Sequence, residues 1–142
     1  MIERMFSLAL WLAGLGHFCL LGASLQVPFR LGWKQDLAKL TPFNRKLMWT
    51  YGAFTVTTIV AFGLLTLGLH EELLRGDRAA LGLAIFIGVY WAARLLVDRC
   101  CFRHTDWPRG LQFVIGHILL VCLFLLLAGT YLGLVAWHVW FR

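Results

Sequence analysis

Four long stretches of the chain are almost free of charged side chains. Residues 5–29, 47–70 and 110–141 contain no Lys, Arg, Asp or Glu, and residues 79–97 contain only Arg94. A helix rises roughly 1.5 Å per residue, so each stretch is long enough to cross a hydrocarbon core of about 30 Å. The pattern predicts an all-α integral membrane protein, a bundle of four transmembrane helices.

Local signals set the expected ends of these helices. Pro28 is expected to close the first helix, because proline is poorly tolerated within a helix. Thr41 and Pro42 read as the N-cap and first residue of the second helix. The expected transmembrane helices cover residues 5–25, 42–69, 79–98 and 108–141.

The connection between the first two helices has a pattern of its own. Trp33, Leu37 and Leu40 recur at helical spacing, and Lys34 and Lys39 lie among the polar residues opposite them. This pattern predicts a short amphipathic helix at the membrane interface.

Composition supports the membrane assignment and a single domain over residues 1–142. Charged residues make up 14% of the chain, whereas soluble domains have about 25%. The net charge of +6 comes from Lys and Arg that flank the apolar stretches. Such residues are topology signals, so nucleic acid is excluded as a partner.

The charges of the connections predict the orientation. Residues 26–46 hold five Lys or Arg against one acid, residues 99–109 hold three against one, and residues 70–78 hold two against three. By the positive-inside rule, the first and third connections are cytoplasmic, and both termini are outside.

Small residues indicate where helices approach one another. They recur every four residues in the third helix, at Ala80, Ala84, Gly88 and Ala92, and the fourth helix contains Gly129 and Gly133. Packing of small residues holds helices together in lipid. These stripes favour contacts inside the bundle over contacts in a homo-oligomer, although both remain open.

Arg94 is the one charged residue within the apolar stretches. Intramembrane charges are often functional, and Arg94 could bind an anionic ligand. It lies about one helical turn from Asp98, so local pairing and snorkelling toward the interface are the preferred interpretation. The stretches contain no Asp or Glu, which argues against a proton-coupled transporter.

His17 and His117 are expected at nearly the same depth if their helices are antiparallel neighbours. Two facing imidazoles can ligate a haem iron, with Arg30, Lys34 and Arg45 near the propionates. This arrangement predicts a possible haem b cofactor. The alternative is a pair of histidines hydrogen-bonded to neighbouring helices.

Tyr51, Thr55 and Thr58 form a polar stripe on the second helix. A path for a substrate or ion is one interpretation, but such hydroxyls more often bond to the carbonyl four residues earlier. Cys100, Cys101 and His104 offer three metal ligands with no evident fourth, so we predict no metal site there.

The segment 79–94, which ends Val89-Tyr90-Trp91-Ala92-Ala93-Arg94, loosely resembles the third helix of the membrane-associated eicosanoid and glutathione metabolism family. The four-helix layout and basic first loop are also similar to that family. The resemblance implies an enzyme acting on a lipid or thiol conjugate. Residues 45–54 lack the Asn and Glu that this family uses for its thiol substrate.

Three functions therefore fit the sequence, and no catalytic residue is identified. The preferred one is a helical subunit or scaffold of a larger membrane assembly, formed with copies of itself or with other membrane subunits. The second is a b-type haem protein in electron transfer, with His17 and His117 as ligands. The third is an interfacial enzyme whose anionic substrate group binds four cationic residues, Arg30, Lys34, Arg45 and Arg94.

Overall fold

The computed structural model describes residues 1–102 and 110–141. Its elements are α1 (Ile2–Arg30), α2 (Trp33–Ala38), α3 (Pro42–Gly68), α4 (His70–Arg75), α5 (Arg78–Cys101) and α6 (Leu111–Phe141). Four of these helices, α1, α3, α5 and α6, are long and apolar enough to span a membrane. The predicted all-α bundle of four spanning helices is confirmed, and the chain is an integral, multi-pass membrane protein.

The two short helices lie in the connections. α2 occupies the segment where a short helix was predicted between the first two spans. α4 was not predicted, because the sequence around it indicated only a mixed connection. Leu73 of α4 is fully buried, and Gly76 ends the helix with a left-handed φ of 79°. Burial of Leu73 against the bundle explains why this short segment folds as a helix.

The helix ends agree with the sequence at α3 and differ at α1. The side chain of Thr41 caps α3 by accepting a hydrogen bond from the amide of Asn44. The prediction that Pro28 closes the first helix is wrong, since α1 continues through Pro28 to Arg30. Pro28 lies two residues from the end of α1, so the hydrogen bond that it removes is in the last turn, and Leu31 still bonds to the carbonyl of Val27 at 3.0 Å.

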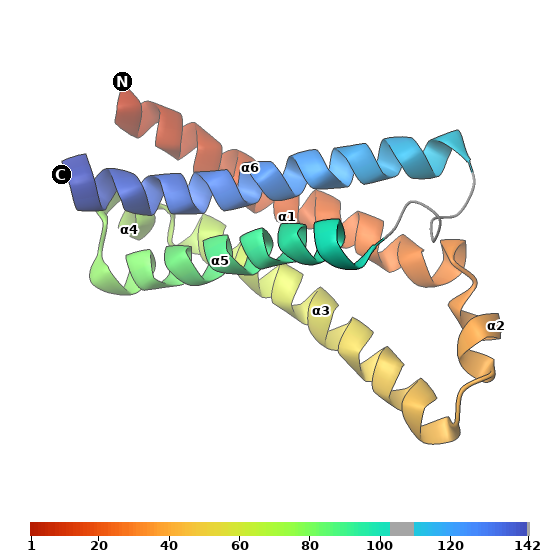
Figure 1. The fold of residues 1–142 in the computed structure, drawn as a ribbon. Helices are drawn as coiled ribbons and strands as arrows, with labels where there is room; N and C mark the ends of the chain where they lie inside the picture. Colours follow the sequence, from red (N-terminus) through yellow and green to blue (C-terminus); the bar gives the residue numbers. More distant parts are fainter. Residues whose placement is uncertain (103–109, 142) are drawn as a thin grey trace.

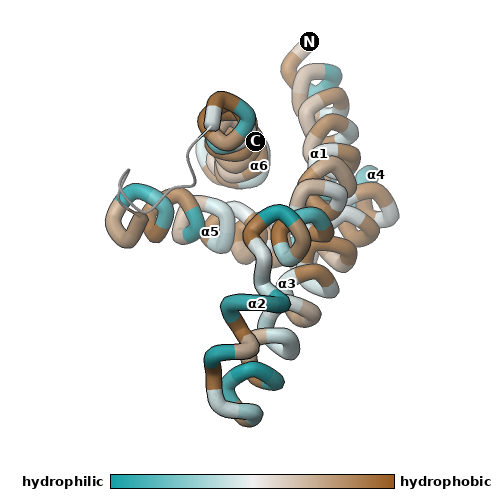
Figure 2. Tube along the Cα trace, turned by 90° about the vertical axis from the view of Figure 1, so that its right-hand side faces the viewer, coloured by the Kyte–Doolittle hydropathy of each residue, from teal (hydrophilic) through white to brown (hydrophobic). Residues whose placement is uncertain are grey.

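The spanning helices pack as two pairs. α1 lies against α3, α5 lies against α6, and the contact between α1 and α6 joins the pairs. Both termini and α4 lie at one end of the bundle, which we call the terminal end, and α2 lies at the other, the α2 end (Figure 1). Hydrophilic residues concentrate in α2 and the adjoining start of α3 (Figure 2).

The small-residue stripe of α5 packs inside the bundle, as the sequence favoured. Ala80, Ala84 and Gly88 are buried, and a Cβ added at Gly88 would lie 2.7 Å from Leu132 of α6. A Cβ added at Gly129 would meet no atom within 4 Å. The stripe on α5, and not Gly129, therefore sets the close approach of these two helices.

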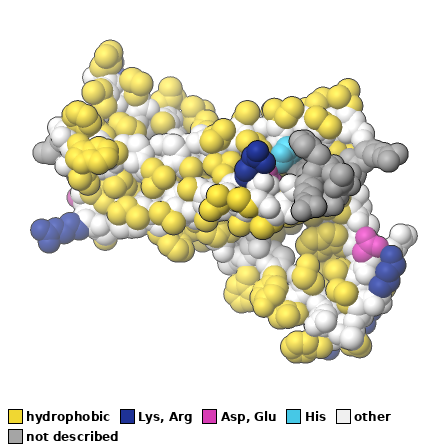
Figure 3. Space-filling view, in the orientation of Figure 1, with side chains coloured by type: hydrophobic (Ala, Val, Ile, Leu, Met, Phe, Trp, Pro, Cys, Tyr) yellow, Lys and Arg dark blue, Asp and Glu magenta, His cyan; other side chains and the backbone are white. Residues whose placement is uncertain are grey.

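The first part of α3 leaves the bundle toward the α2 end (Figure 1). We call residues 42–58 the α3 arm; none of them is buried, and burial begins at Ile59. Hydrophobic side chains dominate the face shown in Figure 3, as expected for a surface in contact with lipid. The packed core therefore lies toward the terminal end, and the helices open toward the α2 end.

Candidate functional site

A fully buried histidine joins α1 to α5 in the middle of the bundle. Nδ1 of His17 lies 2.8 Å from the carbonyl of Ala13, and Nε2 lies 3.1 Å from Nε1 of Trp91. A carbonyl only accepts and an indole only donates, so Nδ1 carries the proton and Nε2 accepts from Trp91. These partners fix the neutral tautomer of His17.

A second buried bond joins α3 to α6. The hydroxyl of Thr66 donates to the carbonyl of Phe62 at 2.7 Å, and its oxygen lies 2.5 Å from the hydroxyl of Tyr131. Since the single proton of Thr66 is used on Phe62, Tyr131 donates to Thr66. Both oxygens are thereby satisfied within the core.

The four residues of these two bonds, His17, Thr66, Trp91 and Tyr131, come from the four spanning helices. We call them the helix junction. The ring of His17 lies 6.1 Å from that of Tyr131, and Trp91 stacks on Phe124 at 5.0 Å. Interhelical hydrogen bonds of this kind contribute to holding membrane helices together. The two hydrogen bonds of the junction connect α1 to α5 and α3 to α6, and their role is structural.

The predicted haem ligands lie in different environments. Both ring nitrogens of His17 are used by the protein, and Nε2 of His117 lies 3.5 Å from Oδ2 of Asp98. Ligation of an iron by Nε2 of His17 would require Trp91 to release that nitrogen. The haem pair stays a prediction.

A charged cluster at the α2 end joins α5 to α6. Asp98, whose side chain is 11% exposed, lies 3.9 Å from Nη1 of Arg94 and faces His117. The guanidinium of Arg94 also lies 5.5 Å from the ring centre of Phe124. Arg94 and Asp98 form the expected local ion pair, and Nη1 of Arg94 makes no hydrogen bond within the described residues. A basic and a histidine side chain lie together within the apolar face in Figure 3.

Asp98 lies near the end of α5. The apolar stretch stops before it at residue 97, whereas the helix expected over residues 79–98 and the observed α5, which ends at Cys101, both include it. The spacing of Arg94 and Asp98 pointed to their pairing. The contact with His117 depends on how α6 packs on α5, which no local pattern specifies. A largely buried carboxylate between a guanidinium and an imidazole, near the end of a spanning helix, is a candidate functional group.

The four residues expected to bind an anion come from four helices, and three of them lie outside the Asp98 cluster. Arg94 pairs with Asp98, and Arg30 donates to the side chain of Gln112 at 3.5 Å. Lys34 and Arg45 are in α2 and the first turns of α3. A joint anion site formed by these residues stays a prediction.

The hydroxyl stripe of α3 is bonded to its own backbone. Thr55 donates to the carbonyl of Tyr51 and Thr58 to that of Phe54, each at 2.9 Å. The interpretation as local bonds is confirmed. His104 lies outside the described residues, and the described residues contain no group of three metal-ligating side chains.

Comparisons of the chain with protein-family models, with curated proteins and with solved structures give no match. Function therefore has to be argued from the geometry.

Proposed function

We propose that the protein is a helical subunit of a larger membrane assembly, and that its α3 arm binds the α3 arm of a second copy of the chain. The observation that carries this proposal is the contrast within α3. Residues 59–66 include the buried Ile59, Phe62, Gly63 and Thr66, whereas none of residues 42–58 is buried.

The outward face of the arm has the composition of a helix–helix interface. Thr50, Ala53 and Thr57 recur at helical spacing, and all three are exposed. Small and hydroxyl-bearing residues are enriched where membrane helices meet, because they allow the backbones to approach closely. A surface used only for lipid contact does not need such a stripe.

The hydroxyls on this stripe are prepared for contact with another helix. Thr50 donates to the carbonyl of Lys46 at 2.9 Å and Thr57 to that of Ala53 at 3.0 Å. Since their protons are already used, an apolar neighbour can cover them without leaving a donor unsatisfied. Burying the hydroxyl groups of the arm against another helix would therefore cost little free energy.

A second copy is the partner that the arm fits. The arm diverges from the rest of the bundle (Figure 1), so another arm can approach its outward face without meeting α5 or α6. Symmetric dimers bury the same patch on both subunits. A stripe of small residues is complementary to itself, which suits a two-fold axis passing near Thr57.

Disulfide cross-linking in lipid vesicles tests this proposal. The four native cysteines, Cys19, Cys100, Cys101 and Cys122, are replaced by serine in the starting protein. Thr57→Cys is expected to form a covalent dimer under mild oxidation, because its sulfur lies near the proposed axis.

The matched control is Leu119→Cys, at an exposed position of α6. It is expected to stay monomeric at the same ratio of protein to lipid. Equal cross-linking of the two variants, or a wild-type chain that stays monomeric at low surface density by single-molecule photobleaching, would refute the arm-to-arm dimer.

A further inference from the structure

The two ends of the bundle differ in charge. Residues 26–46, which cover the end of α1, α2 and the start of α3, hold five Lys or Arg against one acid. At the terminal end, residues 1–4 and 70–78 hold three Lys or Arg against four acids. Positive charge is therefore in excess at the α2 end.

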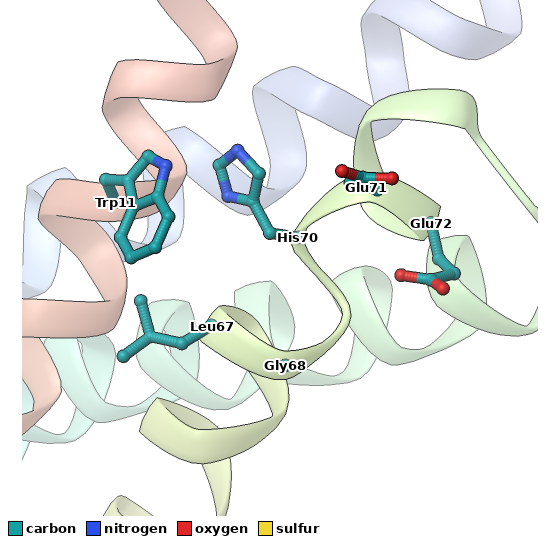
Figure 4. Close-up of a pocket in the computed structure, with 6 residues that line it drawn as sticks. All are labelled: Trp11, Leu67, Gly68, His70, Glu71 and Glu72. Carbon is teal, nitrogen blue, oxygen red and sulfur yellow. The ribbon is translucent and has the colours of Figure 1, made fainter.

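A pocket at the terminal end shows the same difference. It opens where α1, α3 and α4 meet, and its lining contains two carboxylates and no Lys or Arg (Figure 4). The lining consists of Trp11, Leu67, Gly68, His70, Glu71 and Glu72. An anion is therefore disfavoured at the terminal end, and any anionic partner is expected at the α2 end.

α2 runs across the end of the bundle, between the end of α1 and the start of α3 (Figure 1). Leu37 of α2 is buried, and the ring of Trp33 meets that of Trp49 of α3 edge-on, with 5.7 Å between the ring centres. These contacts hold α2 against its neighbours. Because the spanning helices cross the membrane, a helix across their ends lies along the membrane surface.

Two cationic residues flank this aromatic contact. Lys34 directly follows Trp33 in α2, and Arg45 precedes Trp49 by four residues, about one helical turn of α3. The contact between the two rings therefore brings together the segments that carry Lys34 and Arg45. Lys46 is next to Arg45 in α3.

The cationic side chains of the α2 end are exposed and largely without acidic partners. Asp36, the one acid of residues 26–46, is paired with Lys39 at 2.9 Å. Within residues 1–102 and 110–141, Lys34, Arg45 and Lys46 form no ion pair. All of these Lys and Arg side chains are exposed, so an external anion can reach them.

Neighbouring side chains place these cations at the boundary between hydrocarbon and water. Phe43 and Phe54 of α3 are 73% and 67% exposed, as expected for side chains in contact with lipid. Tryptophans such as Trp33 and Trp49 are enriched at the level of the lipid headgroups. The anion that is abundant at this depth is the phosphate of a phospholipid headgroup, which favours lipid over a soluble acidic partner.

We propose that the α2 end binds anionic phospholipids, with Lys34 and Arg45 as the principal contacts and Arg30 and Lys46 beside them. Basic residues close to a membrane surface attract lipids that carry a net negative charge. A zwitterionic headgroup carries its own cation and is attracted less. Lys34 and Arg45 belong to the same copy of the chain, so this site does not depend on the arm-to-arm dimer.

Titration of the detergent-solubilised full chain with single phospholipids, followed by native mass spectrometry, tests the proposal. Phosphatidylglycerol is expected to bind more tightly than phosphatidylcholine. Each cation near a lipid surface contributes about fivefold to the affinity. Lys34→Gln combined with Arg45→Gln is therefore expected to weaken phosphatidylglycerol by about tenfold or more, and to leave phosphatidylcholine unchanged.

Two further double variants are the controls. Arg4→Gln with Arg78→Gln removes two exposed cations from the terminal end, and it is expected to keep the preference for phosphatidylglycerol. Lys34→Arg with Arg45→Lys preserves both charges and is expected to keep it as well. Higher salt is expected to weaken phosphatidylglycerol selectively, because it screens exposed charges.

The affinities of the wild-type chain and the variants decide the proposal. A preference for phosphatidylglycerol that is lost only in the Lys34 and Arg45 neutral variant supports it. Equal affinities of the wild-type chain for the two lipids overturn it, as expected if the surface binds an acidic protein instead. An equal loss in the terminal-end variant also overturns it. Thermal unfolding of each variant shows that the fold is intact.

Discussion

Nε1 of Trp91 donates a hydrogen bond to Nε2 of His17 across the middle of the bundle, at 3.1 Å. Both side chains are nearly or fully buried. The bond joins the first pair of spanning helices, α1 and α3, to the second pair, α5 and α6. It also fixes which nitrogen of His17 carries the proton.

Trp91→Phe is expected to destabilise the folded protein by about 1 kcal/mol or more. Interhelical hydrogen bonds in membranes contribute about this much, and the smaller ring also loses packing against Phe124. Unfolding in mixed detergent micelles measures the change. Trp140→Phe, at a position 75% exposed, is the control; equal stability of both variants would mean that the junction bond contributes nothing.

Thr66→Val and Tyr131→Phe are expected to be non-additive. Each substitution removes the same bond between α3 and α6, so the second adds little once the first is present. A double-mutant cycle on the free energy of unfolding should give a coupling of roughly 1 kcal/mol. Fully additive effects would show that the two hydroxyls act independently.

Gly88→Ala is expected to destabilise the packing of α5 on α6 by about 1–3 kcal/mol, the usual cost of overpacking. Its Cβ would lie 2.7 Å from Cδ2 and 3.3 Å from the backbone nitrogen of Leu132, and the backbone contact cannot be relieved by a rotamer change. Gly82→Ala in the same helix meets no atom within 4 Å. The second variant should unfold like wild type or slightly later in the same detergent titration.

Asp98→Asn is expected to destabilise the protein by on the order of 1–3 kcal/mol, because Arg94 loses its partner within a spanning helix. Asp36→Asn removes a carboxylate whose side chain is 68% exposed, where ion pairs contribute little. The free energies of unfolding of both variants provide the test. A similar small effect at both positions would show that Arg94 reaches water without Asp98.

An absorption spectrum of the purified protein tests the haem hypothesis. Ligation by His17 and His117 would give a Soret band that is lost in both His17→Ala and His117→Ala. Trp91→Phe should then leave the band in place, because it frees Nε2 of His17 for the metal. A colourless protein from cells supplied with haem precursors would refute the pair.

The spanning helices could be predicted well because each one is identified by its own stretch of sequence. A charge-free stretch of sufficient length permits little other than a membrane helix, and Thr41 and Pro42 mark the start of α3 directly. The end of α1 was mispredicted because Pro28 was taken as the helix end. Pro28 lies in the last turn of α1, where the loss of one backbone hydrogen bond is tolerated. α4 was missed because it depends on the burial of Leu73 in a bundle that the local sequence does not describe.

The site residues were harder to predict because their partners lie on other helices. Depth alone placed His17 level with His117, but the rotation of each helix decides which side chains meet, so the hydrogen bond between His17 and Trp91 could not be predicted. Asp98 was already inside the expected third helix, but its contact with His117 depends on how α6 packs against α5. The pocket at His70 combines residues from three helices, and neither periodicity nor composition indicates it.

The helix junction also has a consequence for how the chain is made. His17 and Thr66 are synthesised first, and their partners Trp91 and Tyr131 belong to the second pair of helices. While the first two spans are in the membrane alone, Nε2 of His17 has no Trp91 to bond with. The junction is therefore complete only once α6 packs against the other spanning helices, because Tyr131 of α6 supplies the bond to Thr66.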